Sequence, residues 1–142
     1  SCLFGRAKIS EISFAKKYAL ELLELTGLSN KRELLASQLN FQEQRLLEIS
    51  RALALKPEII LLDEVMAGLN SAELNKIEKL LQEIREDKGL TFFIIEHIMT
   101  SIKSLCDHVI VLAGGRKITE GRPDDIIRDP AVITVYIGDY DA

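Results

Sequence analysis

The sequence predicts an α/β fold in which a partial parallel sheet is flanked by helices and preceded by a helical subdomain. Two short runs, 59–62 and 90–95, are apolar on both faces, which is typical of strands buried in a parallel sheet. Between them, 71–87 carries apolar residues at helical spacing and charged residues elsewhere. A strand, a helix and a second strand in this order are the pattern of the α/β class.

Composition sets limits on the kind of protein. The chain has 142 residues, 47% of them hydrophobic, and a net charge of −4, which favours a folded core over disorder. The sequence has no basic cluster, which argues against nucleic acid as a partner. The longest apolar run, 109–113, is far shorter than the roughly 20 residues that cross a bilayer. Two cysteines, Cys2 and Cys106, form no disulfide framework, which favours a reducing, cytoplasmic compartment.

Residues 1–56 are expected to form the helical subdomain, and 57–142 the α/β part. Apolar residues recur at helical spacing over 13–26, which predicts a first helix. Asn40 and Glu43 have the spacing of a capping box, in which each side chain accepts from the other's backbone N–H. A second helix is therefore expected to begin there.

The last third of the chain continues the alternation. A short helix is expected over 98–105, and a third apolar run follows at 108–112. A Gly-Gly turn then leads into 116–121, which is expected to be the return arm of a hairpin. Pro123 suits the first turn of a helix, and Pro130 is expected to break that helix before a last apolar turn or two.

Polar pairs follow both central strands. Asp63 and Glu64 end the first run, and Glu96 and His97 end the second. Ligands of parallel α/β sheets gather at the carboxyl ends of the strands, so these side chains are expected to converge on one rim. An aspartate there can hold Mg²⁺ through water, a glutamate can polarise an attacking water, and a histidine can stabilise developing phosphate charge. The alternative is that polar residues end these strands only because loops meet water.

Longer segments of the sequence carry a family resemblance. LNFQEQRLLEISRALALKPEIILLDEVMAGLN, residues 39–70, resembles the region from the signature motif through Walker B to the D-loop of ABC-type ATPases. EHIMTSIKSLCDHVIVLAGGRKITEG, residues 96–121, resembles the region that follows, with its switch histidine. The ending VITVYIGD is similar to the tail of the branched-chain amino-acid importer branch. The resemblance implies a P-loop NTPase-like sheet and a role in binding ATP with Mg²⁺.

The resemblance implies a role for each matching residue. Asp63 would hold Mg²⁺, Glu64 would be the catalytic carboxylate, and His97 would contact the γ-phosphate. Two loops would contact ATP across a head-to-tail dimer. The signature loop contributes Asn40, Phe41, Gln42, Glu43 and Gln44. The D-loop contributes Ala67, Gly68, Leu69 and Asn70.

Some positions depart from the family pattern. Asn40 and Gln42 stand where the signature motif usually has serine and glycine, and the long Gln42 side chain would crowd a phosphate. Val65 replaces the usual proline after the catalytic glutamate, and Ile98 replaces an aspartate common after the switch histidine. These changes put the contact of the signature loop with ATP in doubt.

The phosphate-binding loop itself is missing. A P-loop needs G-x-x-x-x-G-K-[ST], and no Gly-Lys-Ser/Thr triplet occurs in the 142 residues. The chain therefore resembles the C-terminal portion of such a subunit, and it is expected not to hydrolyse ATP alone. In the family, the P-loop strand separates the strands matching 90–95 and 108–112. Without it, either the chain self-associates or these two strands pair directly.

Three functions remain open from the sequence. The favoured one is the ATP-binding subunit of an importer, as the resemblance implies. Its partners would be a second ATP-binding subunit, identical or not, and membrane-spanning permease subunits. It would lie in the cytoplasm, at the inner face of the cell membrane. The second is a non-catalytic remnant or dimerisation module, which coding DNA without an upstream P-loop would favour. The third is an ABC-type ATPase outside transport, such as one in DNA repair, against which the tail argues.

Overall fold

The structure is a computed structural model and describes residues 9–138. It divides into two compact units, Ser1–Ile60 and Leu61–Ala142. This division falls inside the first strand, and the expected domain boundary between residues 56 and 57 stays a prediction. Cys2 and the last residue of the expected tail motif, Asp139, lie outside the described residues.

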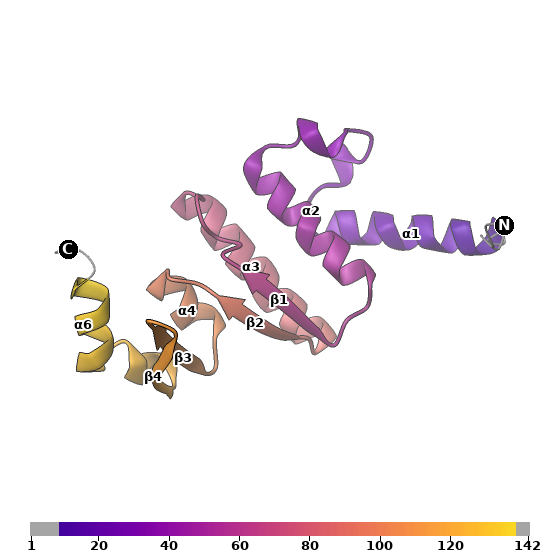
Figure 1. The fold of residues 1–142 in the computed structure, drawn as a ribbon. Helices are drawn as coiled ribbons and strands as arrows, with labels where there is room; N and C mark the ends of the chain where they lie inside the picture. The colour runs from indigo at the N-terminus through magenta and orange to yellow at the C-terminus, as the bar shows by residue number, and fades with distance from the viewer. Residues whose placement is uncertain (1–8, 139–142) are drawn as a thin grey trace, which may run out of the picture. The chain divides into compact units, whose positions relative to one another are not determined.

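The first unit is helical, as the sequence predicts. Helix α1 (Ile9–Leu25) and helix α2 (Phe41–Ala54) are joined by two short 3-10 turns, η1 (Ser29–Lys31) and η2 (Ala36–Gln38) (Figure 1). The predicted helix over 13–26 is thus confirmed, with a start four residues earlier, at the edge of the described part of the chain.

Two side-chain hydrogen bonds join α1 and its end to α2. The Tyr18 hydroxyl donates to the carbonyl oxygen of Leu53 at 3.2 Å. The hydroxyls of Thr26 and Ser50 are buried and lie 2.8 Å apart, and Thr26 also donates to Leu22. Because buried hydroxyls are costly unless they are paired, this contact fixes how the two helices pack.

The predicted strand, helix and strand open the second unit. Strand β1 (Ile59–Asp63) spans the division between the units, helix α3 (Ser71–Lys88) follows, and strand β2 (Thr91–Ile95) pairs with β1. Figure 1 shows the two strands side by side with their arrows pointing the same way. The helix between them is the crossover connection that a parallel pair requires.

Capping residues define where helix α3 begins and ends. The Asn70 side chain accepts hydrogen bonds from the N–H groups of Ala72 and Glu73, at 3.0 and 3.1 Å, and Glu73 accepts from the N–H of Asn70 at 3.0 Å. This is a complete capping box. Gly89 ends the helix with φ of 63°, a conformation that glycine adopts at little cost. The buried stripe of the helix consists of Ile77, Leu80, Leu81 and Ile84.

Helix α4 (Met99–Leu105) leads into an antiparallel hairpin, strands β3 (Val109–Ala113) and β4 (Arg116–Gly121). Two short helices follow, α5 (Pro123–Ile126) and α6 (Pro130–Gly138). Pro130 therefore begins α6 rather than only ending the helix before it, because proline at the first helical position lacks only an N–H that would be unbonded anyway.

The hairpin and the last helices share a small core. Val109 pairs with Gly121, and Ala113 pairs with Arg116 across the turn, with one irregularity after Val111. The core cluster consists of Val111, Ile126 and Val132, with Met99 and Val109 packed against it.

The strands are not buried on both faces, contrary to the prediction. In β1, Leu62 is 8% exposed but Leu61 is 75% exposed. In β2, Phe93 is 56% exposed, so the expectation that the strand over 90–95 is buried on both faces is wrong. Phe92 and Ile94 flank Phe93 in the strand, and both line a hollow shared with Leu81 of α3. Within 9–138, helix α3 therefore covers one face of the pair, and the other face is left open.

The pairing expected between 90–95 and 108–112 does not occur. Among residues 9–138, β1 with β2 and β3 with β4 form two separate two-stranded sheets. Direct closure of the sheet is therefore wrong, and self-association stays a prediction. An unpaired strand edge keeps free N–H and C=O groups, which is the usual template for pairing with another strand.

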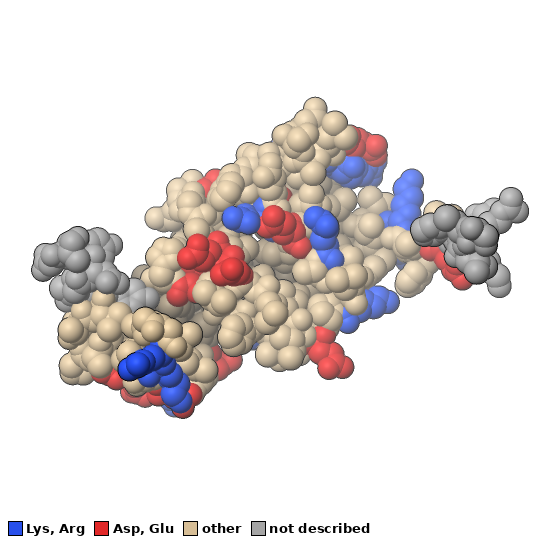
Figure 2. All heavy atoms as spheres, viewed as in Figure 1, with Lys and Arg blue, Asp and Glu red and all other residues tan. Residues whose placement is uncertain are grey.

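The surface and the helices add two observations. On the face drawn in Figure 2, lysine and arginine side chains stand apart from one another among acidic and uncharged surface. Within the described part of the chain, no helix combines the length and the apolar character needed to cross a membrane.

Candidate functional site

The site begins where β1 ends. Glu64 follows Asp63 with φ of 47°, in the left-handed region that side chains other than glycine rarely adopt. Its N–H donates to the carbonyl oxygen of Ile95 at 2.9 Å. The last residue of β2 thus holds the chain as it turns out of the sheet. Such a strained conformation persists only where its surroundings fix it, and it is common at functional sites.

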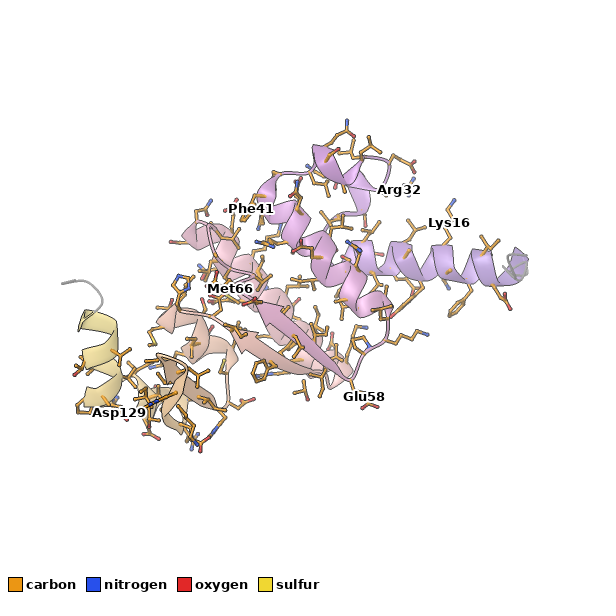
Figure 3. All side chains as sticks on the ribbon, in the orientation of Figure 1. Lys16, Arg32, Phe41, Glu58, Met66 and Asp129 are labelled. Carbon is orange, nitrogen blue, oxygen red and sulfur yellow. The ribbon has the colours of Figure 1, made fainter. Side chains whose placement is uncertain are left out.

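The turn that follows is short and partly buried. Val65 is 5% exposed and Met66 is fully buried. The N–H of Ala67 donates to the carbonyl oxygen of Glu64 at 3.1 Å, and Gly68 has φ of 78°. Figure 3 labels Met66 beside the end of β1. The segment from this turn to α3 consists of the expected D-loop residues Ala67, Gly68, Leu69 and Asn70, and Asn70 is the N-cap of α3.

Glu64 and His97 lie together at this rim. Nδ1 of His97 is 3.8 Å from Oε1 of Glu64, and the two side chains are 63% and 60% exposed. The distance is too long for a hydrogen bond, so each side chain keeps its polar atoms available to a third group. Asp63 is exposed one residue before Glu64, at the end of β1. The structure thus brings two of the three expected residues into contact range, with Asp63 adjacent in the chain.

Glu96 behaves differently from its neighbour. From the sequence, Glu96 is expected on the rim with the other acids, without a role of its own. Its Oε1 instead accepts a hydrogen bond from the N–H of Met66 at 3.0 Å, and its Oε2 is buried. Successive side chains of an extended segment point to opposite sides, and that alternation is the signal that separates Glu96 from His97.

The expected signature loop lies in the first unit. Asn40 caps α2 by accepting from the N–H of Glu43 at 2.9 Å, and Glu43 accepts from the N–H of Asn40 at 3.0 Å, which confirms the predicted capping box. Lys31 forms an ion pair with Glu43 at 2.6 Å. Asn40 therefore already occupies one of the N–H groups that a helix N-terminus offers to a bound anion.

Of the other signature positions, Phe41 and Gln44 make local contacts and Gln42 does not satisfy its side-chain nitrogen. The Arg45 guanidinium lies 4.9 Å from the centre of the half-exposed Phe41 ring. The Gln44 side chain donates to the carbonyl oxygen of Leu39 at 3.0 Å. The Gln42 side-chain nitrogen is buried without a hydrogen-bond partner among the described residues. Gln42 is thus a poorly satisfied residue at the position where the family pattern has glycine.

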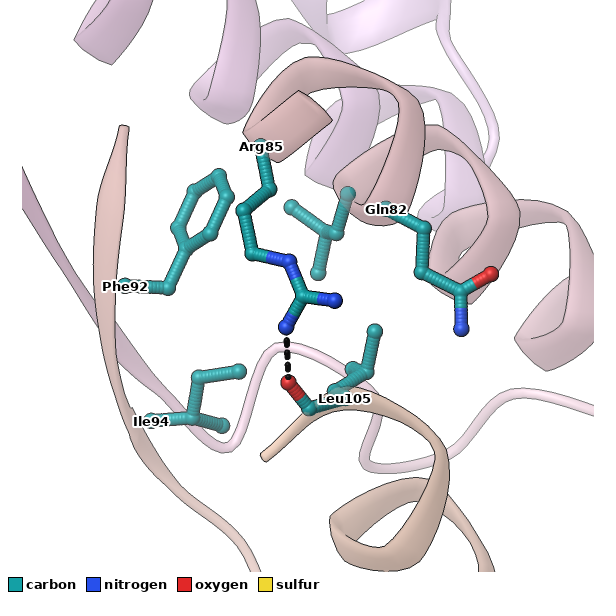
Figure 4. A pocket seen from close by; sticks show the side chains of 6 residues that line it. Gln82, Arg85, Phe92, Ile94 and Leu105 are labelled. Atoms are coloured by element: carbon teal, nitrogen blue, oxygen red, sulfur yellow. Dashed lines mark hydrogen bonds between the residues drawn. The ribbon is translucent and has the colours of Figure 1, made fainter. Parts of the chain in front are cut away.

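A hollow between α3, β2 and α4 is no candidate for a nucleotide. Figure 4 shows Arg85 among its lining residues, donating from Nη1 to the carbonyl oxygen of Leu105 at 3.0 Å. Its volume of about 10 Å³ holds at most one water molecule. Arg85 also forms an ion pair with Asp107 at 3.3 Å. The Arg85 side chain therefore joins α3 to the end of α4 and is not available to a ligand in this hollow. The lining residues are Leu81, Gln82, Arg85, Phe92, Ile94 and Leu105.

A metal ion would find few protein ligands at the rim. Within residues 9–138, no group of three or more His, Cys, Asp or Glu side chains could hold one. Mg²⁺ often takes only one or two carboxylates and completes its shell with water and phosphate oxygens. The exposed Asp63 carboxylate fits that role, but only beside a nucleotide.

Comparison with known proteins adds a family context. Residues 116–142 match a family model described as branched-chain amino acid ATP-binding cassette transporter. The chain is 35% identical over 125 residues to the high-affinity branched-chain amino acid transport ATP-binding protein BraF of Pseudomonas aeruginosa, covering 88% of this chain and 49% of that protein. It is 37% identical over 117 residues to the corresponding protein LivG of Escherichia coli, covering 82% of this chain and 46% of LivG.

A solved structure shows the same arrangement. MJ1267, an ATP-binding cassette of an ABC transporter in its ADP conformation, matches with a TM-score of 0.80 and 30% identity, covering 94% of this chain and 57% of that chain. The fold is thus that of part of an ATP-binding cassette. The chain spans about half the length of the curated relatives it matches.

Proposed function

We propose a function from the premise that this chain corresponds to the C-terminal portion of an ABC transporter ATP-binding protein, the family to which its matches assign it. The chain supplies the Walker B, switch-histidine and signature segments of an ATPase whose hydrolysis of ATP is coupled to import. The importer takes up branched-chain amino acids, a choice supported by the match of residues 116–142 to the branched-chain type.

The contact between Glu64 and His97 carries this proposal. The two side chains end neighbouring parallel strands and lie 3.8 Å apart, exposed and not bonded to each other. The carboxylate of Glu64 polarises the water that attacks the γ-phosphate, acting as a general base. The imidazole of His97 donates a hydrogen bond to the phosphate oxygens, where negative charge develops. A reaction of this kind needs both groups on one side of the phosphate.

The metal and the two loops have supporting roles. Asp63 would hold Mg²⁺, because a single exposed carboxylate at the end of β1 suits an ion that takes most of its ligands from water and phosphate. The signature positions 40–44 and the D-loop positions 67–70 face a second ATP-binding subunit across a shared nucleotide. Asn40 retains the helix cap there, and the crowding at Gln42 weakens the contact of this loop with ATP.

The partners follow from the same family role. The chain acts with a second ATP-binding subunit, identical or different, and with membrane-spanning permease subunits. It is located in the cytoplasm, at the inner face of the cell membrane. The chain alone does not hydrolyse ATP, because its 142 residues contain no G-x-x-x-x-G-K-[ST] loop to hold the phosphates.

A chimeric protein tests this function. The N-terminal half of BraF, which precedes the region matched by this chain, is fused to the full chain, and the release of phosphate from ATP is measured. We expect hydrolysis by the chimera, and its loss in Glu64→Gln and His97→Ala. Glu58→Gln is the matched control, because Glu58 is an exposed acid just before β1 rather than after it. A chimera that binds ATP and loses no hydrolysis in Glu64→Gln contradicts the proposal.

A second function has one observation in its favour. The side-chain nitrogen of Gln42, in the expected signature loop, is buried without a hydrogen-bond partner among residues 9–138, which suits a chain released from catalysis and kept as a dimerisation module. In that case the chimera folds and associates with a second copy, but it does not hydrolyse ATP even when Gln42 is replaced by glycine. Recovery of activity in Gln42→Gly favours the ATPase instead.

A further inference from the structure

We propose that Glu96 is a positioning residue: by accepting the N–H of Met66, its carboxylate holds the turn that carries Glu64 and so sets the spacing between Glu64 and His97. The catalytic meaning of that spacing rests on the proposed function. The positioning itself is a property of the folded chain and stands apart from any activity.

The donor of this hydrogen bond, the N–H of Met66, is shielded from water. Met66 is fully buried, and its N–H lies 3.0 Å from Oε1 of Glu96. A buried N–H without an acceptor is costly, so the turn depends on this carboxylate. The second oxygen, Oε2, is buried and has no hydrogen-bond partner within the described residues. The bond to Met66 is therefore the polar contact that accounts for a carboxylate in this place.

Two successive residues of the β2 end hold the turn. The carbonyl oxygen of Ile95 accepts from the N–H of Glu64 at 2.9 Å, and the side chain of Glu96 accepts from the N–H of Met66. The next residue, His97, carries the imidazole that faces Glu64. One short stretch, 95–97, thus contacts the turn through a backbone carbonyl, a carboxylate and a ring in succession.

The strained backbone of Glu64 explains why a second tether matters. The backbone of Glu64 is strained at φ of 47°. It is expected to relax to ordinary backbone angles unless both sides of the turn are fixed. The bond from Ile95 fixes the entry into the turn. The bond from Glu96 fixes the position two residues later. Loss of the second bond lets Glu64 return to ordinary backbone angles and moves its carboxylate away from His97.

Two variants of similar side-chain length separate the bond from mere packing. Glu96→Gln keeps an oxygen that accepts a hydrogen bond, whereas Glu96→Met fills the same space without an acceptor. The experiment uses the full chain labelled with ¹⁵N and ¹³C. Hydrogen exchange of the Met66 amide, the backbone coupling that reports φ of Glu64, and the His97 ring shifts at a fixed pH are measured.

We expect exchange of the Met66 amide at least tenfold faster in Glu96→Met, with a changed φ at Glu64 and displaced His97 ring signals. Glu96→Gln rescues all three, while the amide of Ile77 in α3 exchanges equally in all forms. Unchanged Met66 exchange in Glu96→Met overturns the proposal. So does an equal acceleration at Met66 and Ile77, since it indicates a general loss of stability.

If Glu96→Met fails to fold, the proposal is tested with Glu96→Gln alone. Glu96→Gln replaces a carboxyl oxygen by an amide oxygen as the acceptor, so the amide proton of Met66 is expected to change its chemical shift relative to the parent chain. An unchanged Met66 amide shift in Glu96→Gln overturns the proposal. Failure of the chimera to hydrolyse ATP counts against the proposed function only, because these measurements need no nucleotide.

Discussion

Nδ1 of His97 lies 3.8 Å from Oε1 of Glu64, although 33 positions of the chain separate the two residues. The pairing of β1 with β2 brings them together, because each residue follows the carboxyl end of its strand closely. Both side chains remain largely exposed. The sheet therefore presents an acid and an imidazole side by side without using either of them to hold the fold.

The strained backbone of Glu64 predicts a difference in stability between two substitutions at this position. A side chain with a Cβ atom is strained at φ of 47°, and glycine is not. We therefore expect Glu64→Gly to be more stable than Glu64→Ala by about 0.5–1 kcal/mol, after the greater freedom of glycine in the unfolded chain is counted. Urea unfolding of the two variants measures the difference. Equal stabilities would mean that the turn relaxes in solution.

The open face of the strand pair predicts opposite results for two adjacent leucines. Leu61 is 75% exposed, so Leu61→Ala is expected to change stability by no more than about 0.5 kcal/mol. Leu62 is 8% exposed, and Leu62→Ala is expected to cost about 2–5 kcal/mol through lost burial and a cavity. Chemical unfolding of both variants checks this pair. A large cost at Leu61 would mean that this face is covered in solution, by a second copy or by another part of the chain.

The capping box of α3 predicts a graded series at Asn70. Its side chain accepts from the N–H groups of Ala72 and Glu73, so Asn70→Ala is expected to cost about 1 kcal/mol. Asn70→Gly is expected to cost only a few tenths, because glycine leaves these groups open to water. Thermal unfolding followed by circular dichroism ranks the three forms. Equal stability of Asn70→Ala and the parent chain would mean that the cap has no energetic role.

An ion pair between α4 and α5 predicts a pH dependence. Lys103 lies 2.7 Å from Asp124, and its hydrogen bond holds the pKa of that carboxyl below its usual 3.8 in the folded chain. A carboxyl with a lowered folded-state pKa stabilises the fold above its unfolded-state pKa, and this contribution is lost as the pH falls through the folded-state pKa.

Asp124→Asn is therefore expected to lower the urea midpoint slightly at neutral pH, and the difference is expected to vanish below both pKa values. The effect is small because both side chains are exposed. Lys103→Met in the Asp124→Asn background should add little at neutral pH. A difference between Asp124→Asn and the parent chain that persists at low pH would point to packing rather than charge.

The sequence predicts the elements of this fold well because their limits are local. Asn40 and Asn70 cap helices through residues three positions away, and Gly89 ends α3 by its own backbone freedom. The alternation of strand and helix and the positions of Glu64 and His97 after two strands are equally readable. These features need no knowledge of distant contacts.

The errors arise where distant parts of the chain decide. Apolar runs on β1 and β2 predict burial on both faces, but Leu61 and Phe93 are 75% and 56% exposed in the part of the chain that the structure describes. Direct pairing of β2 with β3 is equally plausible from sequence, and only the structure shows that it does not form. The bond from Glu96 to Met66 joins residues 30 positions apart, so no local pattern announces it.

The proposed function is tested most sharply by calorimetric titration of MgATP into the isolated chain and into the chimera with the N-terminal half of BraF. Under that proposal, the chain carries groups that act on the γ-phosphate but lacks the loop that binds the phosphates. We therefore expect no saturable heat for the isolated chain and saturable binding for the chimera. Tight, saturable MgATP binding by the isolated chain would refute the proposal.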